Sequence, residues 1–143
     1  MDYLKVLVEE IHSVVVATVD ETGHPHTAVM DMMWEDGKTV YFLTADFKPL
    51  YKRLKEDGRV ALTGMTQGAG TMDRKSISLT GQVEWIGKEH LEELLKANPY
   101  MYEIYPTEEG RSHLQVFRFK NAVGNFYDLT QLPPYQARFE IEG

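Results

Sequence analysis

The chain has 143 residues, of which 43% are hydrophobic and 26% are charged, with a formal net charge of −7 at pH 7. Such a length and composition are typical of one soluble globular domain, residues 1–143, and the negative charge disfavours binding to nucleic acid or to an anionic membrane. The absence of cysteine excludes disulfides and cysteine-ligated metal centres, and the lack of a signal peptide or a long apolar run leads us to expect a cytoplasmic protein.

The N-terminal third of the chain predicts a helix followed by three strands. Asp2 is a suitable N-cap for an amphipathic helix, in which apolar residues recur at helical spacing: Leu4, Leu7, Val8 and Ile11. Runs of β-branched and apolar residues then predict strands over 13–20, 26–34 and 39–44. Asp36–Gly37 is typical of a hairpin turn, which leads into the third strand.

Further along, helical and strand patterns alternate as far as residue 129. A helix is expected from Pro49, which suits a first helical turn, to Gly58, which suits a C-terminal cap. A second helix is expected around Leu91–Leu95. Strands are predicted over 59–66, 76–86 and 113–120, with a weaker one over 125–129. The pattern favours a mainly β (α+β) fold, a small antiparallel barrel with short helices at its margins.

The end of the third strand has the residue types that a phosphate group needs. Thr44 offers a hydroxyl, Lys48 follows in the turn, and Pro49 opens a helix that carries Lys52 and Arg53. A helix N-terminus favours an anion through its free N–H groups and its dipole, although Pro49 has no N–H to give. An anionic ligand is therefore one interpretation, and ordinary solvent-exposed cations are the other.

The histidines and methionines offer further interpretations. His24 and His26 flank Pro25 and supply two metal-ligand side chains, with Asp31 or Glu35 as a distant third. Because histidines in turns and strands are mostly solvated, we predict no metal site. Three methionines and a tryptophan lie close together at the end of the second predicted strand. Such residues are typical of a hydrophobic core, and they would equally suit the wall of a site for a flat aromatic ligand: Met30, Met32, Met33 and Trp34.

Several consecutive segments of the chain resemble those of a known protein family. They are GHPHTAVMDM, the Asp36–Gly37 hairpin and TVYFLTADFKPLYKRLKEDGRVALTG, followed by KSISLTGQVEWI and HLQVFRFKNAVGNFYDL. Together they cover roughly residues 3–130, and the most specific part runs from Gly23 to Gly64. The chain resembles the pyridoxamine 5′-phosphate oxidase-related family of FMN-binding split barrels.

This resemblance implies a homodimer of six-stranded antiparallel split β-barrels with FMN bound at the subunit interface. One strand would pass along the isoalloxazine ring and ribityl chain with these residues: His26, Thr27, Val29, Met30 and Asp31. Thr44 and Lys48 would hold the phosphate with help from Lys52 or Arg53, and Ser76 would direct a polar side chain towards the flavin. The implied partners are a second copy of the chain and a small-molecule substrate or electron donor.

The chain also departs from the true oxidases of that family. His26 stands where they carry an arginine, and Asp31 lies near the place of a lysine. The C-terminal LPPYQARFEIEG contains Arg138 but no histidine after it, so we do not expect oxidation of pyridoxamine phosphate itself. Our leading hypothesis is an FMN-dependent oxidoreductase whose physiological substrate the sequence does not identify. The alternatives are a noncatalytic flavin-binding module, or a split barrel that binds haem or a deazaflavin coenzyme.

Overall fold

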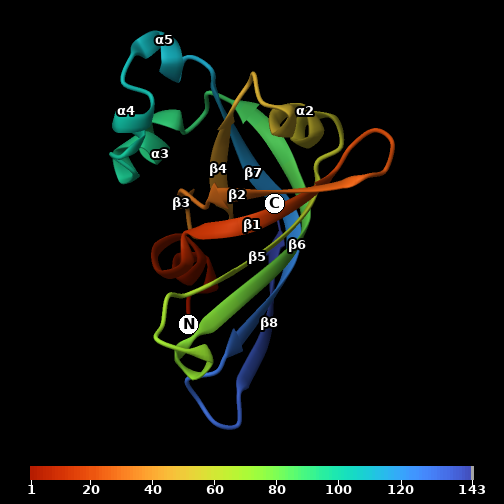
Figure 1. Cartoon of the computed structure of the whole chain (residues 1–143), viewed down its shortest axis with the longest axis vertical. Helices are drawn as coiled ribbons and strands as arrows, with labels where there is room; N and C mark the ends of the chain where they lie inside the picture. The colour runs from red at the N-terminus through yellow and green to blue at the C-terminus, as the bar shows by residue number, and fades with distance from the viewer. Residues whose placement is uncertain (143) are drawn as a thin grey trace.

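A strongly curled antiparallel sheet forms the body of the molecule, and short helices lie at its margins (Figure 1). The computed structural model describes residues 1–142. The strands are β1 (Ser13–Val19), β2 (Pro25–Asp31), β3 (Trp34–Glu35), β4 (Val40–Ala45), β5 (Arg59–Met65), β6 (Lys75–Gly87), β7 (Leu114–Asp128) and β8 (Tyr135–Glu142). The helices are α1 (Tyr3–Lys5), the π-helical η1 (Val6–Ile11), α2 (Pro49–Glu56), the 3₁₀ turn η2 (Thr71–Asp73), α3 (Leu91–Ala97), α4 (Met101–Ile104) and α5 (Glu108–Arg111).

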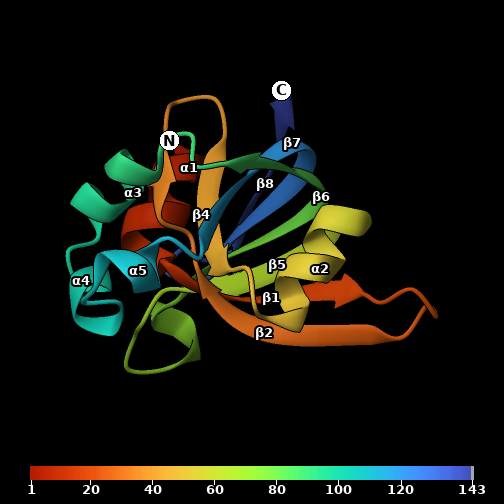
Figure 2. The ribbon, with the colours of Figure 1, turned by 90° about the horizontal axis from the view of Figure 1, so that it is seen from above.

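The sheet has eight strands, and its order explains the curl. Neighbouring strands follow the path β2-β1-β5-β6-β7-β4-β3, and β8 pairs with β7 off this path. The long strand β7 changes partner along its length, because residues 114–118 pair with β4 whereas residues 121–128 pair with β8. As a result the two edges of the sheet, β2 and β3–β4, approach each other as a split barrel (Figure 2).

Two hydrophobic clusters hold this arrangement together. The larger one fills the inside of the curl, where β1 contributes alternate residues such as Val14 and Val16. Every residue of β4 is buried, because one face of this strand lies on the inner core and the other is covered by the segment of α3 and α4. The second cluster therefore fixes these two short helices next to β4, with Leu94 and Met101 as their buried anchors.

Several local predictions are confirmed. The Asp2 side chain accepts a hydrogen bond from the Lys5 N–H and caps α1, and α2 begins at Pro49. Gly37 in the hairpin turn and Gly58 after α2 both have positive φ angles, which glycine adopts without a steric cost. The mainly β split-barrel fold is likewise what the sequence predicted.

Other predictions need correction. The expected strand over 26–34 ends at Asp31, because the Met32 N–H bonds to the His12 carbonyl and the Met33 N–H bonds to the Tyr41 carbonyl. The two strands expected over 113–120 and 125–129 are one continuous β7. The C-terminal segment forms β8, which was not predicted because most of its side chains face solvent and it is ordered only by pairing with β7. The sheet thus has eight strands instead of six.

No helix within residues 1–142 is both long enough and apolar enough to cross a membrane.

Candidate functional site

A cavity of about 590 Å³ lies at the split of the barrel, between the strands β2 and β4 and the helices α2 and α4. This volume is within the range of roughly 300–1,000 Å³ that is usual for small-molecule sites. The residues that line it are Ala28, Val29, Met30, Asp31, Met33, Leu43, Thr44, Ala45, Lys48, Pro49, Leu50, Arg53, Met101, Ile104 and Tyr105. The helices α2 and α4 stand on opposite sides of the two strands, so the cavity has two chemically different ends (Figure 2).

The α2 end of the cavity is cationic. Lys48 and Arg53 line it, and within residues 1–142 neither side chain takes part in an ion pair. Arg53 Nε donates to the buried Thr18 Oγ1 at 2.8 Å, which fixes the guanidinium at the cavity wall. Thr44 adds a hydroxyl from the end of β4 and is 5% exposed. These donors suit an anion that carries several oxygens.

The α4 end of the cavity is apolar apart from one carboxylate. Met101 and Ile104 belong to α4. The other apolar residues at this end are Met33, between β2 and β3, and Leu43 of β4. Asp31, the last residue of β2, brings the acidic group to this end. The cavity thus offers cations at one end, a wide apolar wall at the other, and a single carboxylate beside that wall.

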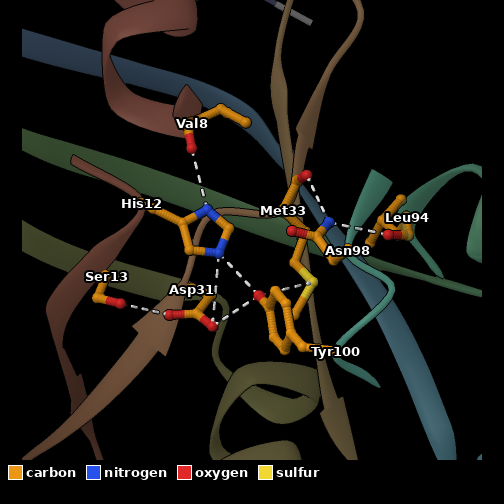
Figure 3. A network of polar contacts seen from close by, with 8 residues as sticks. All are labelled: Val8, His12, Ser13, Asp31, Met33, Leu94, Asn98 and Tyr100. Carbon is orange, nitrogen blue, oxygen red and sulfur yellow. Dashed lines mark hydrogen bonds and ion pairs between the residues drawn. The ribbon is translucent and has the colours of Figure 1, made fainter. Parts of the chain in front are cut away.

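Asp31 belongs to a polar network outside the cavity wall (Figure 3). Tyr100 Oη donates to Asp31 Oδ2 at 2.8 Å and lies 2.7 Å from His12 Nε2. Ser13 Oγ donates to the second carboxylate oxygen at 2.6 Å, and His12 Nδ1 lies 3.0 Å from the carbonyl of Val8. The network therefore holds the Asp31 carboxylate in one orientation at the cavity.

The buried Asn98 places Tyr100 in this network. Its side-chain amide donates to the carbonyls of Met33 and Leu94, both at 2.8 Å (Figure 3). These bonds tie the turn between α3 and α4 to the segment that follows β2. Burial, and after it the hydrogen bond to Asp31, raises the pKa of the Tyr100 phenol well above its usual range.

The structure gathers six of the residues that the resemblance assigned to the cofactor. Val29, Met30, Asp31, Thr44, Lys48 and Arg53 all line the one cavity. Lys52 does not line it and is exposed to solvent on α2. Ser76 lies at the start of β6, where it pairs with Met65 and Tyr127, and it too is outside the lining.

His26 and Thr27 are also outside the lining of this cavity and lie in the exposed part of β2. His26 Nε2 donates to Asp20 Oδ2 at 2.8 Å across the hairpin of β1 and β2. This bond, with those from Thr22 and the His24 backbone, lowers the pKa of the Asp20 carboxyl below its usual range. Among residues 1–142 there is no group of three His, Asp or Glu side chains that could hold a metal ion.

Sequence reasoning missed the α4 wall and the Tyr100–His12 network. Met101, Ile104 and Tyr105 had no recognisable motif, and their place in the cavity follows only from the packing of α4 against β4. Tyr100 and His12 are 88 residues apart in sequence. The one available signal was Asn98–Pro99, which marked the end of α3 and hence a turn.

The comparisons with known proteins agree with this architecture. The family model of pyridoxamine 5′-phosphate oxidase matches residues 2–127. The chain belongs to the pyridoxamine 5′-phosphate oxidase family. No curated protein sequence matches it significantly.

Solved structures extend the match of this pyridoxamine 5′-phosphate oxidase family member to nearly the whole fold. A NimC/NimA family protein from Clostridium acetobutylicum has a TM-score of 0.76 at 20% identity, over 97% of this chain and 94% of the other. A pyridoxamine 5′-phosphate oxidase-related, FMN-binding protein from Nostoc punctiforme has a TM-score of 0.61 at 11% identity, over 90% and 85%. The haem storage protein HutZ from Vibrio cholerae has a TM-score of 0.60 at 16% identity, over 96% and 91%. At such identities the likeness is one of fold, and the fold occurs with more than one cofactor.

Proposed function

We propose that this protein is an FMN-binding oxidoreductase whose cofactor lies in the cavity between β2, β4, α2 and α4. The observation that carries the proposal is the polarity of the cavity. Lys48, Arg53 and Thr44 gather at one end, and an apolar wall with Met33 and Met101 forms the other. FMN has the matching polarity, a dianionic phosphate at one end and a flat aromatic ring at the other.

The phosphate end fits the donors that the chain presents. Arg53 donates from Nε to Thr18, and within the described residues its two terminal nitrogens make no hydrogen bond, so they can make a bidentate contact with phosphate oxygens. Lys48 supplies a second positive charge at the N-terminus of α2, where the helix dipole also favours an anion. The Thr44 hydroxyl has no hydrogen-bond partner in the part of the chain that the structure describes, and a phosphate oxygen would give it one.

The apolar end suits the ring of the flavin. Methionine side chains adapt to flat aromatic surfaces, and Met33 and Met101 line this end of the cavity. Bound FMN would supply the two-electron chemistry, while the protein supplies binding, orientation and electrostatics. Among residues 1–142, Asp31 is the one carboxylate that lines the cavity, and it would lie beside the reacting end of the ring.

We further propose that the protein works as a homodimer, with the second copy covering the outer face of β1 and β2. Val15 and Val29 are directly paired across these strands and are 44% and 73% exposed. Val29 also lines the cavity, so a partner on this face would close the site as well as the exposed edge strand β2. No nucleic acid or membrane is expected as a partner, and a cytoplasmic location is part of the proposal.

Haem is the second candidate, since the fold neighbour HutZ is a haem storage protein. Haem iron needs an axial His, Met, Tyr or Cys, and the cavity offers Met30, Met33, Met101 and Tyr105 but no histidine among its described lining residues. Imidazole ligation is thereby disfavoured. The visible spectrum of the purified protein tests the proposal: flavin absorption bands support FMN, whereas a Soret band would replace FMN with haem.

A spectrum alone does not separate an enzyme from a noncatalytic flavin-binding module. Anaerobic titration of the FMN-loaded protein with reduced nicotinamide, followed by mixing with acceptors, makes the distinction. In an oxidoreductase, the donor should reduce the flavin and bleach its absorbance. An acceptor should then reoxidise the flavin and restore the absorbance at a rate fast enough for catalytic turnover. A flavin that stays oxidised with every donor would favour the noncatalytic module.

A further inference from the structure

A second cavity lies on the other side of the Asp31 network. It has a volume of about 440 Å³ and is lined by Val8, Glu9, His12, Met33, Trp34, Glu35, Ala97 and Asn98. Met33 lines both cavities, Asp31 lines the first and His12 lines the second. Figure 3 shows the network in which Tyr100 links Asp31 to His12. A chain of hydrogen-bonding groups thus begins at a carboxylate in the first cavity and ends at an imidazole in the second.

The number of protons in this network can be counted from its geometry. The Val8 carbonyl can only accept a hydrogen bond, so His12 Nδ1 carries a proton. In the neutral ring Nε2 is then an acceptor, and it lies 2.7 Å from Tyr100 Oη. The phenol has one proton for two acceptors, Nε2 and Asp31 Oδ2. One further proton, placed on Nε2, satisfies every contact at once.

Carboxylate side chains share the surroundings of the His12 ring. Asp31 Oδ2 lies 3.5 Å from His12 Nε2, and Glu9 and Glu35 line the second cavity together with the imidazole. Tyr100 is the remaining titratable group that contacts the ring, and its raised pKa keeps the phenol protonated. The unit can therefore receive a proton without losing a hydrogen bond, and the imidazolium it forms faces carboxylates.

The backbone of His12 gives an independent indication of function. Its φ angle is 63°, a conformation that is unfavourable for residues with a Cβ and that glycine would adopt more easily. Strained residues of this kind persist where the surrounding structure holds them, and they concentrate at functional sites. Here the strain directs the imidazole between Val8 and Tyr100.

We propose that Asp31, Tyr100 and His12 form the acid–base unit of the flavin site, in which Asp31 exchanges a proton with the substrate and His12 stores it. This inference rests on the proposed FMN function. Consider the oxidation of a C–H group next to an O–H or N–H. Bound oxidised flavin would accept the hydride with both electrons, and Asp31 takes the proton that is released when the O–H or N–H bond breaks. The phenol of Tyr100 then takes that proton and gives its own to His12 Nε2. In the direction of reduction the same proton returns to the product.

Asp31 is the catalytic residue of this unit, because it lines the first cavity, whereas Tyr100 and His12 are positioning and storage residues that act through it. The His12 side chain is 29% exposed and lines the second cavity, through which it exchanges its proton with water.

The first test needs no cofactor. Long-range proton–nitrogen NMR correlations of the apo protein, recorded at a pH where the ring is neutral, report which nitrogen of His12 carries the proton. We expect the proton on Nδ1 in the wild type and in Tyr100→Phe. A proton on Nε2 would overturn the proposal, because His12 would then have no acceptor site for the phenol proton.

The second test follows proton uptake while bound FMN is photoreduced in weakly buffered solution with an indicator dye, so that the flavin takes the place of the substrate as the group that exchanges a proton with Asp31. We expect His12→Gly and Tyr100→Phe to bind FMN as the wild type does but to take up the proton about 100-fold more slowly, a usual size for the loss of an acid–base group. Glycine suits the positive φ of residue 12, so the His12→Gly backbone should fold. Imidazole added to solution should restore the rate in His12→Gly by entering the second cavity, and should not restore it in Tyr100→Phe.

His90→Gly is the matched control. His90 is the other non-glycine residue with a positive φ in the described chain, at 62°, and its ring packs against Trp34 and Tyr41 away from the first cavity. Its proton uptake should equal that of the wild type. Wild-type rates in both His12→Gly and Tyr100→Phe would overturn the acid–base unit while leaving the FMN proposal intact. A wild type that fails to bind FMN would contradict the proposed function, and the NMR experiment would still decide the proton arrangement.

Discussion

Arg53 Nε donates a hydrogen bond to Thr18 Oγ1 at 2.8 Å, and this contact joins α2 to β1. Thr18 is 3% exposed, so the bond is screened from water and holds the guanidinium in one orientation at the cavity. Lys52, one residue earlier on the same helix, has no such anchor and points to solvent. Two neighbouring cations of one helix therefore have different roles.

The first prediction follows from this difference. Arg53→Ala should weaken FMN binding by roughly 10- to 150-fold, because a charge-assisted contact is worth about 1.5–3 kcal/mol. Lys52→Ala should bind FMN as the wild type does. Flavin fluorescence titration measures both. The Arg53 variant should also lose about 1 kcal/mol of unfolding free energy, because the buried Thr18 hydroxyl loses its partner. Equal losses in the two variants would point to a general charge effect instead of a phosphate contact.

Lys48 gives a second prediction, in which the ligand serves as the control. Lys48→Ala should weaken FMN binding by roughly 10- to 150-fold but leave riboflavin binding unchanged, because riboflavin lacks the phosphate. Thr44→Val should show the same dependence on the phosphate with a smaller loss, since its hydrogen bond comes from a neutral hydroxyl. Titration of both flavins against the three proteins checks this. If FMN binds Lys48→Ala and the wild type equally well, Lys48 is an ordinary surface lysine.

The third prediction concerns the homodimer. Val29→Lys should produce monomers at micromolar concentration, because it puts a charge on an apolar face that the second copy would bury. Leu132→Lys is a matched control, since Leu132 is 74% exposed, close to the 73% of Val29, but lies between β7 and β8. Its mass by light scattering should stay that of a dimer. A monomeric wild type with flavin present would contradict the dimer and the closed site together.

Close strand packing predicts a stability difference between two glycines. At Gly81 an added Cβ would overlap the backbone oxygen of Asn121 and lie 2.5 Å from Ala122 Cα, so β6 and β7 would have to separate. Gly81→Ala should therefore lower the unfolding free energy by about 1–3 kcal/mol or more. At Gly70 nothing lies within 4 Å of such a Cβ, and Gly70→Ala should stay within about 0.5 kcal/mol of the wild type. Denaturant unfolding of the two variants measures the contrast.

A fifth prediction concerns pH. The hydrogen bond from Arg59, whose Nε lies 2.7 Å from Asp57 Oδ1, lowers the pKa of the Asp57 carboxyl to about 2. Because the pKa of Asp57 is lower in the folded state, the pair contributes its full stabilisation above the unfolded-state pKa of about 4. This stabilisation is lost as the pH falls through the folded-state pKa of about 2. The wild type should therefore exceed Asp57→Asn in stability at pH 7, by less than about 1 kcal/mol because the Arg59 side chain of the pair is solvent-exposed. This gap should close between pH 4 and pH 2. A gap that persists at pH 2 would assign the effect to something other than the carboxylate charge.

The sequence alone was sufficient for the elements whose signals are local. The strands β1 and β6, the Pro49 start and Gly58 end of α2, and the Asp36–Gly37 turn were all predicted correctly. It also placed Thr44, Lys48 and Arg53 close together, because a strand end and the following helix turn are close in space whatever the rest of the fold does. These features depend on residues a few positions apart, where side-chain periodicity and backbone preferences act directly.

Tertiary structure alone decided which residues share the cavity. Lys52 and Arg53 are chemically alike neighbours, and only the buried Thr18 on another element selects Arg53. The α4 wall and the contact of Tyr100 with His12, 88 residues away, depend on how α3 and α4 pack against β4. In the same way β8 exists because β7 offers it a partner edge. Such contacts have no local signature, since they arise from the burial of apolar surface between segments that are distant in the chain.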